Sequence, residues 1–390
     1  MVRRTLEPVL RDQATRYPVI TVTGPRQSGK TTLCRATFPD KPYLSLEPPD
    51  EREFARADPR GFLARVPDGA IIDEVQHVPE LLSYVQSLVD ARPRPGMFVL
   101  TGSQHFGLVE AVTQTLAGRT ALAQLLPLSL DEIRRFPAPP TELPEVLWTG
   151  GYPRIYDQHL PPFEWLGNYV ATYVERDVRR VLHVTDLVAF QTFLRLSAGR
   201  AGQLLNLSAL GADAGISQPT ARHWLSVLEA GYVAFRLPAL HANLRKRLVK
   251  TPKLYFHDTG LLCYLLGIRT AGQLESHPLR GAVFENWVVT EVLKYHLHRG
   301  VTPTLHFYRD RQGTEVDLLV DLGHAIILAE AKSGRTLPPD AFDALDRLGA
   351  EGVTPVPHRH VVVYGGADTQ TRTAGEVLSW TDVGEYPWTK

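Results

Sequence analysis

Residues 24–31 read Gly24-Pro25-Arg26-Gln27-Ser28-Gly29-Lys30-Thr31 and match the spacing G-x-x-x-x-G-K-[ST] at every position. Glycines in this pattern let the backbone turn so that several N–H groups point at one anion, and a following helix adds its positive N-terminal end. The pattern therefore predicts a loop that holds the phosphates of a nucleotide, with Lys30 at the β- and γ-phosphates and the Thr31 hydroxyl on Mg²⁺. The predicted nucleotide-binding residues are Gly24, Pro25, Arg26, Gln27, Ser28, Gly29, Lys30, Thr31 and Thr32.

The segments on either side of the loop have the pattern that such a loop requires. Residues 18–23 are a short β-branched run that predicts a buried strand, and residues 32–36 continue as a helix. Residues 70–74 and 97–101 predict further buried strands between helical patterns. Strands that alternate with helices are typical of the α/β class, so we expect a P-loop NTPase domain over residues 1–138.

Two acidic residues end the second of these strands. In Ile71-Ile72-Asp73-Glu74, the acids are expected at the sheet edge where the phosphate loop lies. Asp73 is predicted to bind Mg²⁺ and Glu74 to polarise the water that attacks the γ-phosphate. The alternative is a strand end with solvated acids. The acid pair indicates hydrolysis and not transfer, so ATP and Mg²⁺ are the predicted substrate and cofactor.

Further polar residues are candidates for the same reaction. Ser103 or Gln104, which follow the strand over residues 97–101, are predicted to sense the γ-phosphate, and the alternative is a simple polar junction. An arginine, from this chain or from a neighbouring subunit, is often needed to offset the charge that develops at this phosphate. The candidates are Arg119, Arg176 and Arg179, and for each the competing interpretation is an ordinary salt bridge.

The whole-chain composition excludes several classes of protein. The 390 residues carry a formal net charge of zero, so a nucleic-acid surface would have to be a local patch. The 2 cysteines, Cys34 and Cys263, are far apart, which argues against a disulfide framework or a zinc site. No apolar run is long enough for a membrane span, and the first residues do not form an apolar signal core. We expect a cytoplasmic protein without a membrane partner.

Composition changes along the chain predict four segments. Prolines between residues 137 and 144 mark the first break. The predicted segments are the P-loop ATPase domain over residues 1–138, a helical linker or lid over 139–200, a winged helix over 201–250 and an α/β domain over 251–390.

The winged-helix prediction rests on a local order of elements. Residues 207–210 open a short helix, residues 218–228 predict a second helix with Ser217 as its N-cap, and residues 231–237 predict a strand. Gln218, Thr220, Arg222 and His223 lie on the candidate recognition helix. The strongest basic run follows, and it suits contacts to a phosphate backbone, although such runs are often simply solvated. Its residues are Arg245, Lys246, Arg247, Lys250 and Lys253.

In the last segment, charged residues interrupt apolar patterns at three places. Glu285 lies on a predicted helix, Asp317 lies in a predicted strand, and Glu330 and Lys332 end the next strand. The two-residue spacing places Glu330 and Lys332 on one face of that strand. An apolar strand does not carry two charges on one face without a reason. The simpler alternative is that the two side chains pair with each other or cap a sheet edge.

Several motifs together resemble a large family of prokaryotic predicted ATPases of the AAA+ superfamily. The resemblance rests on the motifs already quoted, on residues 100–103 and 116–119, and on Gly150-Gly151-Tyr152-Pro153 and Glu175-Arg176-Asp177. Residues 258–261 and 281–285 resemble the C-terminal half of that family, a domain of unknown function. The resemblance covers nearly the whole chain. It implies an AAA+-like ATP-binding core, a winged helix and a nuclease-like C-terminal fold, but no cellular role.

The acids of the last segment also resemble the PD-(D/E)XK nuclease superfamily, in which carboxylates hold Mg²⁺ and a lysine orients the attacking water. This resemblance implies that Asp317 and Glu330 are metal ligands, that Lys332 orients the water and that Glu285 is an auxiliary ligand. Val316 stands where the superfamily has proline.

Three functions follow from these observations. The leading hypothesis is ATP hydrolysis that drives a conformational change in a C-terminal half which binds nucleic acid or a partner. The second is an ATP-regulated, Mg²⁺-dependent DNA nuclease. The third is a nucleotide-dependent regulator that binds DNA or protein without cutting. The expected partners are ATP, DNA, and a protein partner or further copies of the chain.

Overall fold

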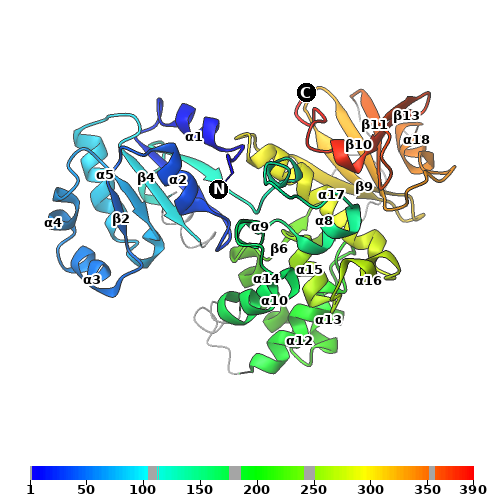
Figure 1. Cartoon of the computed structure of the whole chain (residues 1–390), viewed down its shortest axis with the longest axis horizontal. Coiled ribbons are helices and arrows are strands. Elements are labelled where there is room, and N and C mark those ends of the chain that lie inside the picture. The colour runs from blue at the N-terminus through cyan, green and yellow to red at the C-terminus, as the bar shows by residue number, and fades with distance from the viewer. Residues whose placement is uncertain (1, 104–111, 113, 175–185, 241–250, 351–355) are drawn as a thin grey trace. The chain divides into compact units, whose positions relative to one another are not determined.

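The computed structural model describes residues 2–103, 112, 114–174, 186–240, 251–350 and 356–390 (Figure 1). The chain divides into two compact units. The first comprises Met1–Leu128, Glu229–Tyr232 and Leu297–Gly300, and the second comprises Ser129–Leu228, Val233–His296 and Val301–Lys390. The four segments predicted from the sequence differ from this division and stay a prediction.

A parallel sheet forms the centre of the first unit. In the described residues its strand order is β2-β3-β4-β1-β5, and every neighbouring pair is parallel. Because the strands are parallel, their carboxyl ends meet at one edge of the sheet. The strands are β1 Val19–Thr23, β2 Tyr43–Ser45, β3 Ile71–Asp73, β4 Phe98–Gly102 and β5 Thr120–Gln124. The helices are α1 Glu7–Gln13, α2 Lys30–Thr37, α3 Pro49–Ala57, α4 Pro59–Ala64, α5 Leu81–Ala91 and the short 3₁₀ helix η1 Val75–His77.

Apolar side chains cover this sheet on both faces. On one face, Val85 and Val89 of α5 pack in the same cluster as Phe98 and Leu100 of β4. On the other face, Leu10 of α1 and Leu33 and Cys34 of α2 lie in one cluster with Ile20 and Val22 of β1. Strands buried on both faces read as continuous apolar runs, which explains why they were visible in the sequence.

The second unit begins with short helices. They are α7 Leu130–Ile133, α8 Leu143–Thr149, α9 Pro153–Asp157, α10 Pro162–Tyr169, the π-helical turn η2 Val170–Val174, α12 Leu187–Ala198, α13 Leu207–Asp213, α14 Gln218–Ala230, α15 Thr259–Leu265 and α16 Ala271–Glu275. Strands β6 Ala234–Leu237 and β7 Lys253–Phe256 pair antiparallel after α14. Ser217 accepts the N–H of Thr220 at 3.2 Å, as an N-cap would, and so supports the predicted start of α14.

A mixed sheet ends the second unit. In the described residues its order is β12-β13-β11-β10-β9-β8; β10, β11 and β13 run parallel, and the other neighbours are antiparallel. Leu345 and Leu348 of α18 pack with Val316, Leu328 and Val362 of the sheet. The elements are α17 Arg280–Leu297, β8 Leu305–Arg309, β9 Glu315–Asp321, β10 Ile326–Lys332, α18 Asp343–Ala350, β11 His358–Tyr364, β12 Gln370–Arg372, β13 Gly375–Ser379 and η3 Trp380–Asp382.

Among the described residues, no helix is both long enough and apolar enough to cross a membrane.

Candidate functional site

The phosphate loop joins β1 to α2 and starts where a side chain would not fit. Gly24 has a φ of +150°, and a Cβ atom built on it would lie 2.1 Å from the carbonyl oxygen of Leu125. Leu125 is held there because its N–H donates to the carbonyl of Thr23 at 2.8 Å. Gly29 caps α2 in the left-handed region, with a φ of 92°. Both motif glycines therefore stand where the backbone needs them.

Lys30 is the first residue of α2, and only 5% of it is exposed. Its ammonium donates to the carbonyl oxygens of Gly24, at 3.0 Å, and Pro25, at 2.8 Å. Burial lowers the pKa of Lys30 to about 8, although the charges of Glu74 and Asp73 oppose that shift. An anion beside the ammonium would favour its charged form, so this environment suits a phosphate.

Asp73 ends β3, and its carboxylate accepts hydrogen bonds from hydroxyl groups of three other elements. Thr31 donates to its two carboxylate oxygens at 2.9 and 3.1 Å, and Tyr43 donates at 2.7 Å. Thr101 of β4 also donates to Asp73. Mg²⁺ prefers carboxylate and hydroxyl oxygen ligands, so this donor set fits the ion that the motif implies. Thr31 and Asp73 would hold it, and when bound it would offset the charge of the β- and γ-phosphates.

Glu74 leaves the strand in a left-handed conformation, with φ 57° and ψ 42°. Its carboxylate accepts hydrogen bonds from Gln76 and, at 3.3 Å, from Ser103. Non-glycine residues in this region store about 1–3 kcal/mol of strain and persist only where their surroundings hold them. The acid predicted to polarise water and a residue predicted to sense the γ-phosphate are therefore in contact. Gln104, the other predicted sensor, lies outside the described residues.

Two residues that the sequence did not single out stand beside Glu74. Glu47, Glu74 and His77 each offer one atom that could bind a metal ion, and these three atoms lie within 4.8 Å of one another. Among the described residues, this is the group of acidic, histidine and cysteine side chains with that spacing. The Nε2 atom of His77 lies 3.2 Å from a carboxylate oxygen of Glu47. One imidazole and two carboxylates are ligands that suit zinc and similar ions. Glu47 follows β2 in a segment with several acidic residues, so no local motif distinguishes it.

Arg4 also belongs to this site, although no sequence motif marks it. Its guanidinium donates to the carbonyl of Ser28 inside the phosphate loop at 2.7 Å and to that of Leu126 at 2.8 Å. Only 6% of Arg4 is exposed. Arg4 therefore fixes the loop against the segment that follows β5.

Arg119 lies away from this site within its own chain. Thr120 pairs with Val19 at the amino ends of two parallel strands, whereas the phosphate loop follows the carboxyl end of β1. Two guanidinium nitrogens of Arg119 donate to Asp90 at 2.6 and 2.9 Å, and this hydrogen bonding raises the pKa of Arg119. Within one chain Arg119 therefore forms a salt bridge, which was the competing interpretation. Its role at the γ-phosphate of a neighbouring subunit stays a prediction. Arg176 and Arg179 lie outside the described residues.

In the second unit, the predicted acidic residues are brought together. Asp317 of β9 accepts the N–H of Ala331 at 3.0 Å, next to Glu330 on β10. Burial raises the pKa of Glu330 to about 8 and that of Glu285 to about 7, and the charge of Asp317 adds to both shifts. The ammonium of Lys332 lies 2.7 Å from the carboxylate of Glu330, which is the pairing named as the simpler alternative.

Lys253 corrects one expectation from the sequence. The sequence places it in a basic run expected at the surface, but only 1% of Lys253 is exposed and its ammonium lies among carboxylates. The change follows from β7, which pairs with β6 and turns this residue inward. Arg222, predicted to contact nucleic acid, is exposed on α14, and its role stays a prediction. Arg245, Lys246, Arg247 and Lys250 lie outside the described residues.

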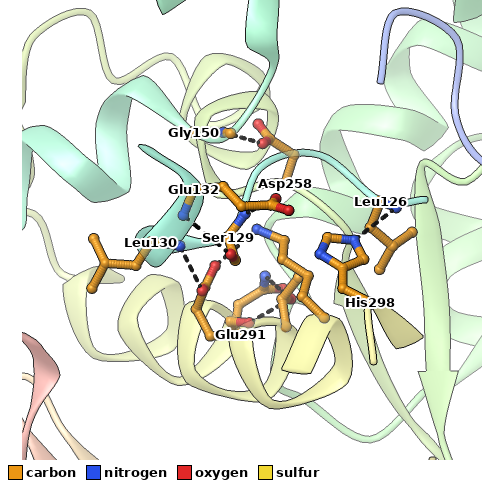
Figure 2. Close-up of polar contacts among 12 residues, drawn as sticks. Leu126, Ser129, Leu130, Glu132, Gly150, Asp258, Glu291 and His298 are labelled. Atoms are coloured by element: carbon orange, nitrogen blue, oxygen red, sulfur yellow. Dashed lines mark hydrogen bonds and ion pairs between the residues drawn. The ribbon is translucent and has the colours of Figure 1, made fainter. Parts of the chain in front are cut away.

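A separate buried polar network holds the second unit together (Figure 2). Glu291 of α17 accepts the N–H of Leu130 at 2.9 Å and pairs with Lys294 at 2.8 Å. Asp258 caps α15 by accepting the N–H of Leu261 and also accepts that of Gly151, at 2.6 Å. Because these carboxylates are bound to backbone donors, we interpret the network as structural.

Three protein-family models match the chain one after another. They are described as an AAA domain over residues 16–134, a domain of unknown function (DUF8612) over 140–272 and a domain of unknown function (DUF4143) over 280–383. Two relatives are Uncharacterized protein Rv2008c of Mycobacterium tuberculosis and Uncharacterized protein Mb2031c of Mycobacterium bovis. Each is 32% identical over 325 residues, which cover 82% of this chain and 71% of the relative. The chain belongs to the family of these two proteins.

Solved structures show weaker likeness. The Walker-type ATPase PABY2304 of Pyrococcus abyssi aligns with a TM-score of 0.46 and 16% identity, over 67% of this chain and 94% of that protein. The RuvB Holliday junction branch migration motor of Thermotoga maritima aligns with a TM-score of 0.30 and 19% identity, over 60% of this chain and 87% of that protein. At TM-scores below 0.5, neither likeness establishes a shared fold.

The AAA domain match over residues 16–134 confirms the prediction of an AAA-type P-loop ATPase domain in the first unit. The other two matched domains have no known function and assign no activity to the second unit. The winged helix and the nuclease-like fold stay predictions.

Proposed function

We propose that this protein hydrolyses ATP at the phosphate loop of its first unit. The observation that carries the proposal is the direct contact between Thr31 and Asp73, at 2.9 Å, beside the buried ammonium of Lys30. Lys30 and Thr31 come from the start of α2 and Asp73 from the end of β3. Together they supply the metal ligands and the phosphate-binding cation that the reaction needs.

Each residue then has a defined role. The backbone of residues 24–31 and Lys30 bind the phosphates, and Thr31 and Asp73 hold Mg²⁺. Glu74 orients and polarises the attacking water. Ser103, whose hydroxyl lies 3.3 Å from the Glu74 carboxylate, senses the γ-phosphate. An arginine from a neighbouring copy would offset the developing charge.

One contact supports coupling between nucleotide state and the rest of the chain. The hydroxyl of Tyr232 donates to Thr23 at 2.9 Å, and Thr23 directly precedes the phosphate loop. Tyr232 belongs to the first unit, but it follows directly on α14 of the predicted winged helix. A change at the loop would therefore act on the segment that leads out of this helix. We propose that hydrolysis changes what the second unit binds.

The Glu74→Gln variant tests the assignment of the water-polarising acid. It is expected to bind ATP with an affinity near that of the wild type and to release phosphate at least about 100-fold more slowly. Ser45→Ala is a control, because Ser45 lies on neighbouring β2 and is assigned no role. Unchanged phosphate release by Glu74→Gln would remove Glu74 from the proposed mechanism.

A second candidate function is nucleic-acid binding by the second unit without cutting. It is supported by the order α13, α14, β6 and β7 and by the exposed Arg222 on α14. Binding of duplex DNA should weaken with salt, and neutralising Arg245, Lys246 and Arg247 should reduce the salt dependence. DNA binding that the substitutions leave unaltered would remove these three residues from the proposed interface, and a failure to bind DNA would contradict this second candidate function.

A further inference from the structure

The acidic cluster of the last domain consists of Glu285, Glu315, Asp317 and Glu330 in the second unit, and it already contains a cation. The ammonium of Lys253 on β7 lies 2.8 Å from a carboxylate oxygen of Glu285 and 2.5 Å from one of Glu315. It lies 3.6 Å from a carboxylate oxygen of Asp317. Glu285 and Asp317 are two of the residues that the nuclease resemblance assigns to a metal.

A divalent ion between Glu285 and Asp317 would need the place of this ammonium. Mg²⁺ binds oxygen ligands at about 2.1 Å and tolerates little distortion, and two cations within a few ångströms repel each other strongly at a buried site. The Lys253 side chain cannot easily move out of the cluster. The backbone of Lys253 is paired with Leu237 of β6, and only 1% of the residue is exposed.

The second carboxylate oxygens of Glu315 and Asp317 also have partners in the chain. Arg309 donates to that of Glu315 at 2.8 Å. Tyr255 donates at 2.6 Å to the same Glu285 oxygen that Lys253 contacts. The second oxygen of Asp317 accepts the N–H of Ala331 at 3.0 Å.

The same holds for the last member of the motif. The carboxylate of Glu330 is paired with Lys332 at 2.7 Å. The four carboxylates Glu285, Glu315, Asp317 and Glu330 thus face the three cations Lys253, Arg309 and Lys332. Little negative charge is left over to attract a divalent ion.

We propose that Lys253 is a built-in counter-ion that takes the place of a divalent metal, so that the acidic cluster of the last domain binds no Mg²⁺ and cleaves no phosphodiester. The ion pairs of the cluster then hold β7 against α17 and β9. The second unit binds its partner without cutting it. This inference does not depend on ATP hydrolysis by the first unit.

Binding of Mn²⁺ to the full-length protein without nucleotide tests the inference. Wild type and Asp317→Asn should bind the same number of Mn²⁺ ions by titration calorimetry. Lys253→Met, which removes the ammonium and keeps an unbranched chain of similar length, should bind one Mn²⁺ more. That additional ion should be absent from Lys253→Met/Asp317→Asn.

Lys294→Met is the matched control, because it removes another buried lysine, paired with Glu291 at 2.8 Å and 4% exposed. It should not create the additional site. The inference is wrong if the wild type binds an ion that Asp317→Asn loses, or cuts DNA or RNA in a manner that Asp317→Asn abolishes. It is also wrong if a folded Lys253→Met gains no ion. Should Lys253→Met not fold, the comparison of wild type with Asp317→Asn still decides.

Discussion

The hydroxyl of Thr31 donates hydrogen bonds to both carboxylate oxygens of Asp73, at 2.9 and 3.1 Å, although 42 positions separate the two residues in the chain. The parallel sheet brings them together, because β1 and β3 end at the same edge. Their contact joins the phosphate loop to the acidic motif, and the proposed ATP hydrolysis depends on it.

Replacing Asp73 by asparagine should abolish the metal dependence of hydrolysis. The amide has one oxygen acceptor where the carboxylate has two, and it lacks the charge that holds Mg²⁺. We expect phosphate release to fall at least about 100-fold. The control is Asp90→Asn, which breaks the pair with Arg119 at the other end of the sheet. An Asp73→Asn variant that keeps wild-type phosphate release and Mg²⁺ dependence would contradict the metal assignment.

Replacing Arg4 by methionine should weaken ATP binding and lower stability together. The variant leaves the buried carbonyls of Ser28 and Leu126 without this donor, and losing a charged donor to buried groups costs about 1.5–3 kcal/mol. Thermal unfolding and titration with a fluorescent ATP analogue measure the two effects. Arg3→Met is the control, because the Arg3 side chain is 71% exposed. Equal melting temperatures for both variants would mean that Arg4 does not fix the loop.

Replacing Gly150 by alanine should destabilise the second unit. Gly150 has a φ of +71°, and a Cβ atom there would lie 2.3 Å from a carboxylate oxygen of Asp258. Gly267→Ala is the matched control, because its φ is +76° but no atom lies within 4 Å of the added Cβ. Both positions have a positive φ, and only Gly150→Ala adds a clash with Asp258. We expect Gly150→Ala to lose about 1–3 kcal/mol more free energy of unfolding than Gly267→Ala. Equal losses would show that Asp258 does not pack against Gly150.

Asp258 should make stability depend on pH in a definite direction. Burial raises the pKa of Asp258 above its usual value, although the N–H of Gly151 and the charge of Lys294 oppose that shift. A raised pKa means that the folded protein binds the proton more tightly than the unfolded chain. The contribution is therefore present below the usual value of 3.8 and is lost as the pH rises through the folded pKa.

The comparison variant for this effect is Asp258→Asn, which does not titrate. The free energy of unfolding of the wild type, minus that of Asp258→Asn, should fall as the pH rises from 3.8 through the raised pKa of Asp258. Denaturant unfolding at several pH values in this interval measures it. A difference that is flat or rises with pH would contradict the stated environment of Asp258.

Local patterns predicted much of the first unit. The expected strand over residues 18–23 is β1 Val19–Thr23, and the helix expected from Thr32 begins two residues earlier at Lys30. Both follow from an apolar run and a motif, which are visible within a few residues. The pattern placed Asp73 correctly at a strand end. It could not show that Glu74 turns into a left-handed conformation, because contacts with Gln76 and Ser103 hold it there.

Contacts between distant residues left no such signal. Arg4 reaches Ser28 and Leu126 across 24 and 122 positions. Lys253 stands close to a basic run in the sequence, so its charge suggested a surface position. Its burial becomes evident only when β7 is paired with β6 and α17 and β9 supply its carboxylates. Long-range ion pairs of this kind depend on the assembled fold and not on local composition.

The most direct test of the account is Mg²⁺-dependent release of phosphate from ATP by purified wild type and Lys30→Ala. The variant removes the ammonium that lies in the phosphate loop and leaves the Thr31–Asp73 contact in place. We predict that the wild type hydrolyses ATP and that Lys30→Ala is at least about 100-fold slower while unfolding at a similar temperature. Equal rates for the two proteins, or no hydrolysis by wild type under any Mg²⁺ and partner condition, would contradict it.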